Sequence, residues 1–209
     1  MTIWNTIYKQ FKNGGAAWAT LSEEVHPLFT SFVNQSTFEV QSAFDIGCGT
    51  GKYLKALQSQ GFKTAGIDSS DIAVQMTKSI LDDDSDIFCV NMFTFEIPKN
   101  RYDFIISIST IHHGTKKSVE QLVNTIYEVL VKNGKFFITV PDFEANKKKN
   151  NFKDQEEIEV GTFVPVSGPE KGLPHSFYTK EEAKKLFSKF NNVQVTADSY
   201  GRWVIRGSK

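Results

Sequence analysis

Short apolar runs alternate with amphipathic segments along this chain, a pattern that is typical of an α/β domain. Residues 102–109 form an almost continuous apolar run, as expected for a strand buried on both faces of a sheet. In residues 119–131 the apolar positions recur at helical spacing and mark one buried face. We expect Lys132-Asn133-Gly134 to end this helix, because a glycine after the last periodic residue is a stop signal.

The same patterns predict the other elements. Strands are expected around residues 43–44, 63–68, 86–91, 135–140, 193–197 and 203–205. Helices are expected at residues 52–58 and 71–81, with a further helix that is capped by Thr179. The order of strands and helices therefore predicts one layered α/β domain without internal repeats.

A glycine-rich turn joins the first strand to the first helix of this pattern. Residues 45–52 are Asp-Ile-Gly-Cys-Gly-Thr-Gly-Lys, so glycines fall at 47, 49 and 51. The dinucleotide fingerprint needs glycine where Lys52 stands, and a phosphate-binding loop needs serine or threonine where Tyr53 stands. The turn therefore favours a nucleoside ligand without phosphates to hold. The alternative is a tight turn that uses glycine only for its positive φ angles.

Residues 45–51 resemble motif I of the class I S-adenosylmethionine-dependent methyltransferases, and residues 43–142 resemble the bacterial small-molecule branch of that family. The resemblance implies a Rossmann-like, doubly wound, seven-stranded sheet whose last strand is antiparallel, within a single domain spanning residues 1–209. It also implies S-adenosyl-L-methionine as the cofactor. The turn residues expected to bind this cofactor are Asp45, Gly47, Cys48, Gly49 and Gly51.

Further cofactor contacts follow from the ends of the predicted strands. Asp68 ends the second strand, where a carboxylate can accept both ribose hydroxyl protons. Its alternative role is a helix N-cap, but Ser70 or Asp71 can fill that role. In the related enzymes an acidic residue holds the adenine amino group, and here Asn91 stands at that place. The other residues expected at the cofactor are Ser69, Met92, Phe93, Ser107, Ile108 and Tyr8, of which Met92 and Phe93 are equally consistent with plain core packing.

Three histidines are the candidate catalytic residues. His112 and His113 follow the fourth strand, at the sheet edge where open α/β folds bind ligands. Because adjacent side chains should point in different directions, we expect one of the two in the site and the other packed against local backbone. His175 is followed by Phe177 and Tyr178, a group that suits a small-molecule pocket. Methyl transfer depends mainly on the positioning of the acceptor, so the reaction can also proceed without any catalytic side chain. No metal site is predicted.

Two segments lie outside the core pattern. Residues 1–36 are expected to form a helical lid over the cofactor, with Tyr8, Phe11 and Trp18 as covering residues or as packing at the sheet edge. Residues 143–178 are too long for an ordinary connection and are expected to form an insertion on the substrate side. The lysines at 147–149 are too few to indicate nucleic-acid binding.

The composition indicates which classes of binding partner are expected. The chain of 209 residues carries 24 basic and 24 acidic side chains, so no strong field attracts nucleic acid or anionic membrane. No apolar run approaches the length of a membrane span, and Cys48 and Cys89 are expected to be buried, reduced thiols. We therefore expect a soluble, cytoplasmic protein, monomeric or homodimeric.

The sequence is compatible with three functions. The first is methyl transfer to a small molecule. The second is methyl transfer to tRNA, because residues 108–113 resemble the methyltransferases that complete wobble-uridine side chains. The third is a non-catalytic protein that binds S-adenosylmethionine.

Overall fold

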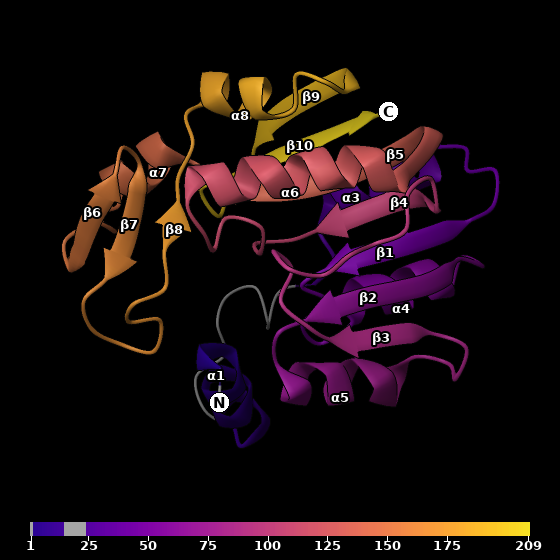
Figure 1. Ribbon diagram of the computed structural model, residues 1–209, viewed down its shortest axis with the longest axis horizontal. Coiled ribbons are helices and arrows are strands. Elements are labelled where there is room, and N and C mark those ends of the chain that lie inside the picture. Colours follow the sequence, from indigo (N-terminus) through magenta and orange to yellow (C-terminus); the bar gives the residue numbers. More distant parts are fainter. Residues whose placement is uncertain (1, 15–23) are drawn as a thin grey trace.

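A seven-stranded mixed sheet forms the centre of the protein in the computed structural model, which describes residues 2–14 and 24–209 (Figure 1). The strand order is β3-β2-β1-β4-β5-β10-β9. Its strands are β1 (Ser42–Ile46), β2 (Lys63–Asp68), β3 (Asp86–Cys89), β4 (Tyr102–Ser107), β5 (Leu130–Pro141), β9 (Asn191–Ala197) and β10 (Arg202–Ser208). The first five pair in parallel, while β10 runs antiparallel to both β5 and β9. The expected doubly wound sheet with an antiparallel last strand is confirmed.

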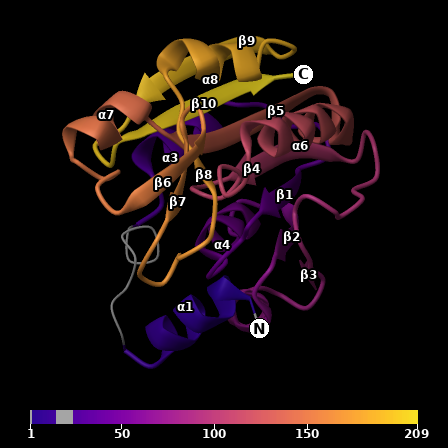
Figure 2. The ribbon, with the colours of Figure 1, turned by 60° about the vertical axis from the view of Figure 1, so that its left-hand side comes forward.

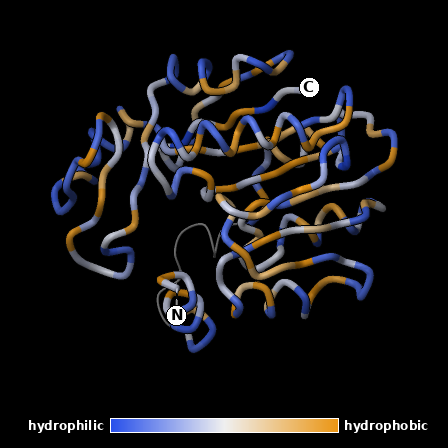
Figure 3. Tube along the Cα trace, in the orientation of Figure 1, coloured by the Kyte–Doolittle hydropathy of each residue, from blue (hydrophilic) through white to orange (hydrophobic). Residues whose placement is uncertain are grey.

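Helices cover both faces of this sheet. On one face α3 (Pro27–Asn34), α4 (Lys52–Gln58) and α5 (Asp71–Ile80) enclose an apolar cluster that includes Phe104 and Phe137. On the other face α6 (Lys116–Val129) and α8 (Lys180–Leu186) enclose a second cluster around Phe136. Figure 3 shows the matching pattern, with hydrophobic central strands and hydrophilic turns at the surface. The two cores hold the sheet rigid, so that side chains at its edge are held in place.

The boundary between α6 and β5 differs from the sequence prediction. The helix ends at Val129, and β5 begins at the fully buried Leu130, which pairs with Tyr102 of β4. The register then shifts before Lys135, and Asn133 adopts a φ of 62° within this irregularity. The expected helix stop at residues 132–134 is therefore wrong, because burial of Leu130 against β4 starts the strand before the glycine is reached.

The predicted environment of the two cysteines is half correct. Cys48 is buried in the turn after β1. Cys89 is exposed, because β3 is an edge strand of the sheet and this side chain faces outward.

Two further units lie beyond the carboxyl ends of the parallel strands, as Figures 1 and 2 show. The first is α1 (Ile3–Lys12). The second comprises α7 (Phe143–Lys148) and a three-stranded sheet of β6 (Gln155–Glu159), β7 (Thr162–Pro165) and β8 (His175–Ser176). Inside the second unit the rings of Phe152 and Phe163 stack at 4.1 Å. Residues 143–178 thus form a small packed layer with an aromatic core of their own.

None of the helices in the described part of the chain combines the length and the apolarity that crossing a membrane requires.

Candidate functional site

A cavity of about 520 Å³ opens at the carboxyl ends of β1, β2 and β4, between α1 and the 143–178 layer. This volume lies in the range of small-molecule and cofactor sites. Of the residues expected at the cofactor, those that line the cavity are Asp45, Gly47, Cys48, Gly49, Asp68, Ser69, Asn91, Met92, Phe93, Ile108 and Tyr8. All three candidate catalytic histidines, His112, His113 and His175, line it as well.

Gly51 and Ser107 do not line the cavity; they support its wall. Gly51 is the N-cap residue of α4 and packs so closely on Thr77 that a Cβ would lie 2.9 Å from the threonine methyl group. The buried Ser107 hydroxyl donates a hydrogen bond to the Ile46 carbonyl at 2.7 Å. This bond ties β4 to β1 directly beneath the glycine turn.

The glycine turn is shaped by close approaches as well as by backbone angles. Gly47 has a φ of 79°, and a Cβ there would lie 2.1 Å from the Thr110 methyl carbon. Gly49 has a φ of 58°, and a Cβ there would lie 2.7 Å from the Tyr8 hydroxyl oxygen. Both positions therefore need glycine for conformation and for space. The bare backbone of the turn faces the cavity.

Two buried carboxyl groups lie next to this turn. Asp68 accepts hydrogen bonds from the backbone N–H groups of Gly49 (3.0 Å) and Ser70 (2.9 Å). Ser70 is the N-cap of α5, so Asp68 is free of that role, as expected. Burial raises the pKa of Asp68 to about 6, against the opposing effect of its backbone hydrogen bonds. The Oδ1 atom of Asp45 is buried and has no hydrogen-bond partner in residues 2–14 and 24–209. Burial, and to a smaller extent the charge of the nearby Asp68, raises the pKa of the Asp45 carboxyl group too.

In the segment that follows β3, the residues Asn91, Met92 and Phe93 line the cavity. The Asn91 Oδ1 atom accepts a hydrogen bond from the Phe93 N–H at 2.9 Å, which shapes the turn. Met92 and Phe93 are partly buried and pack against the core under α6 while they also line the cavity. Both side chains therefore belong to the cavity wall and to the core at once.

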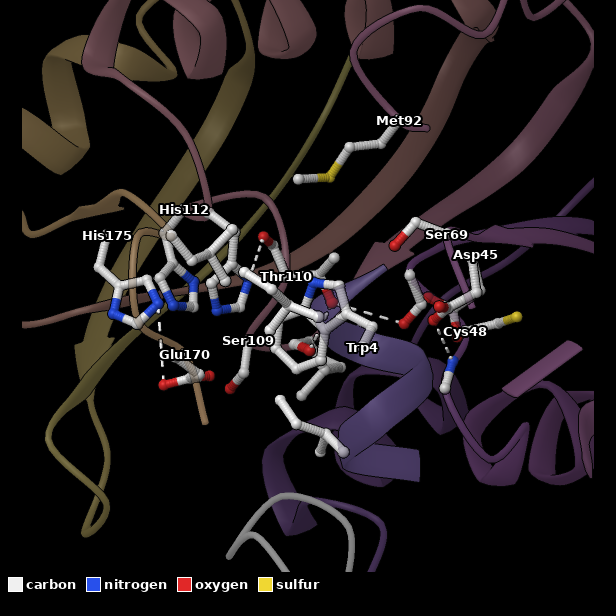
Figure 4. A pocket seen from close by; sticks show the side chains of 18 of the residues that line it. Trp4, Asp45, Cys48, Ser69, Met92, Ser109, Thr110, His112, Glu170 and His175 are labelled. Atoms are coloured by element: carbon white, nitrogen blue, oxygen red, sulfur yellow. Dashed lines mark hydrogen bonds and ion pairs between the residues drawn. The ribbon is translucent and has the colours of Figure 1, made fainter. Parts of the chain in front are cut away.

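The histidines gather at the far end of the cavity. In Figure 4, His112 and Glu170 lie at one end and Asp45 and Ser69 at the other, with Thr110 between them. The ring centroids of His112 and His113 are 4.0 Å apart, and the His175 ring lies 4.8 Å from that of His113. The expectation that the adjacent histidines diverge is wrong, because the tight turn from Thr110 to Gly114 turns both rings into the same cavity.

Burial keeps these rings neutral. It lowers the pKa of His113 to about 3 and that of His175 to about 4. For His112 burial lowers the pKa well below its usual range, and the neighbouring His113 adds to the effect. Glu170 lies beside them, and its burial raises the pKa of the carboxyl group to about 7. Neutral imidazole rings in a cavity offer lone pairs and N–H groups rather than positive charge.

A buried polar network supports the cavity from the side of β10. The Arg202 Nε atom donates to Asp198 at 2.7 Å, and a terminal nitrogen of Arg202 donates to the Ser109 hydroxyl at 2.9 Å. His26, the N-cap of α3, lies 3.6 Å from the same Asp198 carboxylate. Ser109 has a φ of 54°, an uncommon conformation for a residue other than glycine. The network fixes Ser109 and the guanidinium group at the cavity wall.

The N-terminal segment contributes only in part as expected. Trp4 and Tyr8 of α1 line the cavity, and the Trp4 ring meets His113 edge-on at a centroid distance of 4.8 Å. Phe11 lies one turn further along and lines a separate hollow between α1 and α5. Helix α3 packs on the sheet beside α4, away from the cavity. Trp18 lies outside the described residues.

The residues that line the cavity without having been predicted there include Trp4, Ser109, Glu170 and Arg202. Trp4 stands four residues before Tyr8, and this helical spacing was a usable signal. The other three carry no local signal, since only the packed fold brings residues 109, 170 and 202 to one cavity.

Comparisons with known proteins show which family the chain resembles. A family model described as "Methyltransferase domain" matches residues 18–195. The tRNA (carboxymethyluridine(34)-5-O)-methyltransferase of Schizosaccharomyces pombe is 30% identical over 122 residues, which cover 58% of this chain. The match covers 50% of that curated relative, so the chain spans about half of its length.

Two solved structures share the fold. A SAM-dependent methyltransferase from Methanosarcina mazei has a TM-score of 0.70 at 17% identity, over 90% of this chain and 99% of the other. The 1,6-didemethyltoxoflavin-N1-methyltransferase of Burkholderia thailandensis, solved with its acceptor and S-adenosylhomocysteine, has a TM-score of 0.67 at 12% identity. That match covers 99% of this chain and 87% of the other.

The chain belongs to the methyltransferase domain family. It shares the fold of the two solved structures, one a SAM-dependent methyltransferase and the other a methyltransferase with bound S-adenosylhomocysteine. The cavity suits S-adenosylmethionine, because it combines bare glycine backbone, a carboxyl group that accepts backbone donors and a buried Asp45 oxygen with no hydrogen-bond partner among the described residues.

Proposed function

We propose that this enzyme transfers the methyl group to a small-molecule acceptor bound among the histidines of the cavity. The observation that carries the proposal is that two units outside the main sheet line this end of the cavity. Trp4 lines it from α1, and Glu170, Leu173, His175 and Phe177 line it from the 143–178 layer. The strand β6 of the same layer exposes Glu156, Glu157 and Glu159, and this negative charge disfavours a polyanionic substrate.

The cofactor is proposed to lie along the glycine turn. Asp68 accepts the ribose hydroxyl protons with the lone pairs that its two backbone donors leave available. Asn91 faces the adenine amino group, with Met92 and Phe93 against the ring. The unpartnered Oδ1 of Asp45 suits a cationic donor such as the ammonium group of the methionine part. Tyr8 covers the turn from α1.

S-adenosylmethionine supplies a sulfonium-bound methyl group that is transferred by in-line displacement. The protein then has to hold the acceptor atom in line and exclude water, and position alone provides much of the rate. We propose that His112, His113 and His175 do this by hydrogen bonding to the acceptor, and that Trp4 keeps solvent away.

The proposal is tested by incubating the purified protein with labelled S-adenosylmethionine and a panel of small hydroxylated and nitrogenous acceptors. We expect S-adenosylhomocysteine to form with at least one acceptor, and the His175→Phe variant to lower the rate by raising the KM for that acceptor. Turnover with bulk tRNA and with no small molecule would contradict the small-molecule assignment.

Cofactor affinity is expected to fall as the pH is lowered. Asp68 offers a charged acceptor to both ribose hydroxyl groups only when it is ionised, and its raised pKa of about 6 places the loss of this acceptor between pH 7 and pH 5. Over this interval the Kd for S-adenosylhomocysteine should rise roughly tenfold if Asp68 alone titrates, and further where Asp45 takes up a proton too. Calorimetry in buffers of constant ionic strength measures the change. A Kd that stays constant from pH 7 to pH 5 is the contrary result.

A tRNA acceptor is the second candidate, supported by the 30% identity to the Schizosaccharomyces pombe enzyme. If tRNA is the substrate, its binding should weaken steeply with salt, because phosphate contacts release counterions. We expect little such binding, since the chain has no net charge and β6 is acidic. Salt-dependent retention of tRNA together with tRNA-dependent formation of S-adenosylhomocysteine would favour this second candidate.

A further inference from the structure

We propose that His113, Glu170 and His175 bind a divalent transition-metal ion, of the class to which Zn²⁺ and Co²⁺ belong, at the acceptor end of the cavity. One ligand atom from each residue lies within 4.8 Å of the others. The three side chains come from the turn after β4, the loop between β7 and β8, and β8 itself. Two imidazoles and one carboxylate are a donor set that such ions prefer.

The His113 ring is already oriented as a metal ligand. Its Nδ1 atom lies 2.9 Å from the Thr110 carbonyl oxygen, which only accepts hydrogen bonds, so Nδ1 carries the proton. The lone pair is therefore on Nε2. Metal-binding histidines are held in this way, with one ring nitrogen donating to a carbonyl and the other turned to the ion.

His175 and Glu170 face each other without a hydrogen bond. The Nε2 atom of His175 is buried and has no hydrogen-bond partner in the described protein. It lies 3.8 Å from the nearest Glu170 oxygen, beyond hydrogen-bond range, as the dashed line in Figure 4 marks. A cation held between them satisfies a buried ring nitrogen and a partly buried carboxylate at once.

Binding requires only a small contraction of this group. In a four-coordinate zinc site with bond lengths of about 2.0–2.1 Å, neighbouring ligand atoms lie about 3.3 Å apart. Glu170 lies in a loop between Gly168 and Gly172, and a Cβ at either glycine would meet no atom of the described residues within 4 Å. The loop on either side of Glu170 therefore has open space beside it.

Three protein ligands leave coordination positions open, as in catalytic rather than structural sites. This consequence rests on the proposed function: with the ion bound, His113 and His175 would hold the acceptor through the ion instead of by direct hydrogen bonds. The acceptor would coordinate the ion through an oxygen, and the ion would lower the pKa of the acceptor hydroxyl group. The acceptor O–H bond then loses its proton to solvent, the O–CH₃ bond forms as the S–CH₃ bond breaks, and the thioether leaves. The acceptor class is a hydroxylated molecule able to chelate a metal.

The test is titration of the untagged, metal-free protein with Co²⁺, without cofactor, followed by visible absorption and calorimetry. We expect ligand-field bands that saturate at one ion per chain, with Glu170→Gln and His175→Ala each weakening affinity by at least about tenfold. The matched control is Glu156→Gln, which removes an exposed carboxylate of the same layer outside the ligand set and should bind Co²⁺ like the wild type.

Retained binding of S-adenosylhomocysteine by Glu170→Gln and His175→Ala shows that these variants fold. Absence of saturable Co²⁺ binding, or equal binding in both ligand variants, would overturn the metal site. Neither outcome bears on cofactor binding, so failure of the metal site is distinguishable from failure of the proposed function.

Discussion

The Asp68→Ala variant is expected to bind S-adenosylmethionine at least about 100-fold more weakly than the wild type. The carboxylate is proposed to accept two ribose hydroxyl protons, and hydrogen bonds to a charged group contribute about 1.5–3 kcal/mol each. The variant also frees the Gly49 N–H, which the carboxylate now accepts at 3.0 Å, and so loosens the turn that faces the cofactor. Calorimetric titration of both proteins measures the ratio of the two Kd values.

Two further variants separate the contributions to this loss. Asp71→Ala removes an exposed carboxylate at the start of α5, three residues away, and should leave the affinity unchanged. Asp68→Asn keeps the shape of the side chain and one acceptor oxygen, so its affinity should lie between those of Asp68→Ala and the wild type. If Asp68→Ala bound like Asp71→Ala, the assignment of Asp68 to the ribose would be wrong.

Replacing Phe104 by alanine is expected to lower the free energy of unfolding by about 3–5 kcal/mol. This ring is fully buried in β4 and lies within 5.3 to 6.4 Å, centroid to centroid, of four other phenylalanine rings. These neighbours are Phe29, Phe32, Phe38 and Phe62. Because two of these rings belong to α3 and the other two to the loops before β1 and β2, the cavity left by Phe104→Ala cannot close by a single local shift.

Urea denaturation followed by circular dichroism measures this loss. The control is Phe88→Ala in the edge strand β3, where the ring is 46% exposed and the cost should be below about 1 kcal/mol. Equal effects of the two substitutions would show that the aromatic cluster under α3 and α4 does not support the sheet.

Periodicity was sufficient to predict most core strands and helices, because each shows its burial pattern locally, whereas the arrangement of the strands in the sheet was implied by the family resemblance. The bounds of β2 at residues 63–68 and the Thr179 capping box of α8 agree with the sequence prediction. The end of α6 does not, since it depends on the pairing of Leu130 with β4. A local glycine signal at Gly134 cannot reveal that a neighbouring strand already holds the chain.

Part of the candidate site, too, could be predicted from the sequence, and part could not. Its glycine turn and Asp68 lie within 24 residues of one another, so a motif with fixed spacing could predict them. The acceptor end depends on side chains that are distant in sequence, such as His113, Glu170 and Arg202. Their meeting is decided by how the 143–178 layer and β10 pack against the sheet edge, and no sequence spacing encodes that.

The most direct test of the account is a crystal structure of the protein with bound S-adenosylhomocysteine. We expect the ribose hydroxyls on Asp68, the adenine beside Asn91 and Phe93, and the sulfur atom directed toward the histidine end of the cavity. Ligand density elsewhere, or with the sulfur turned away from His113, would contradict both the cofactor assignment and the proposed acceptor site.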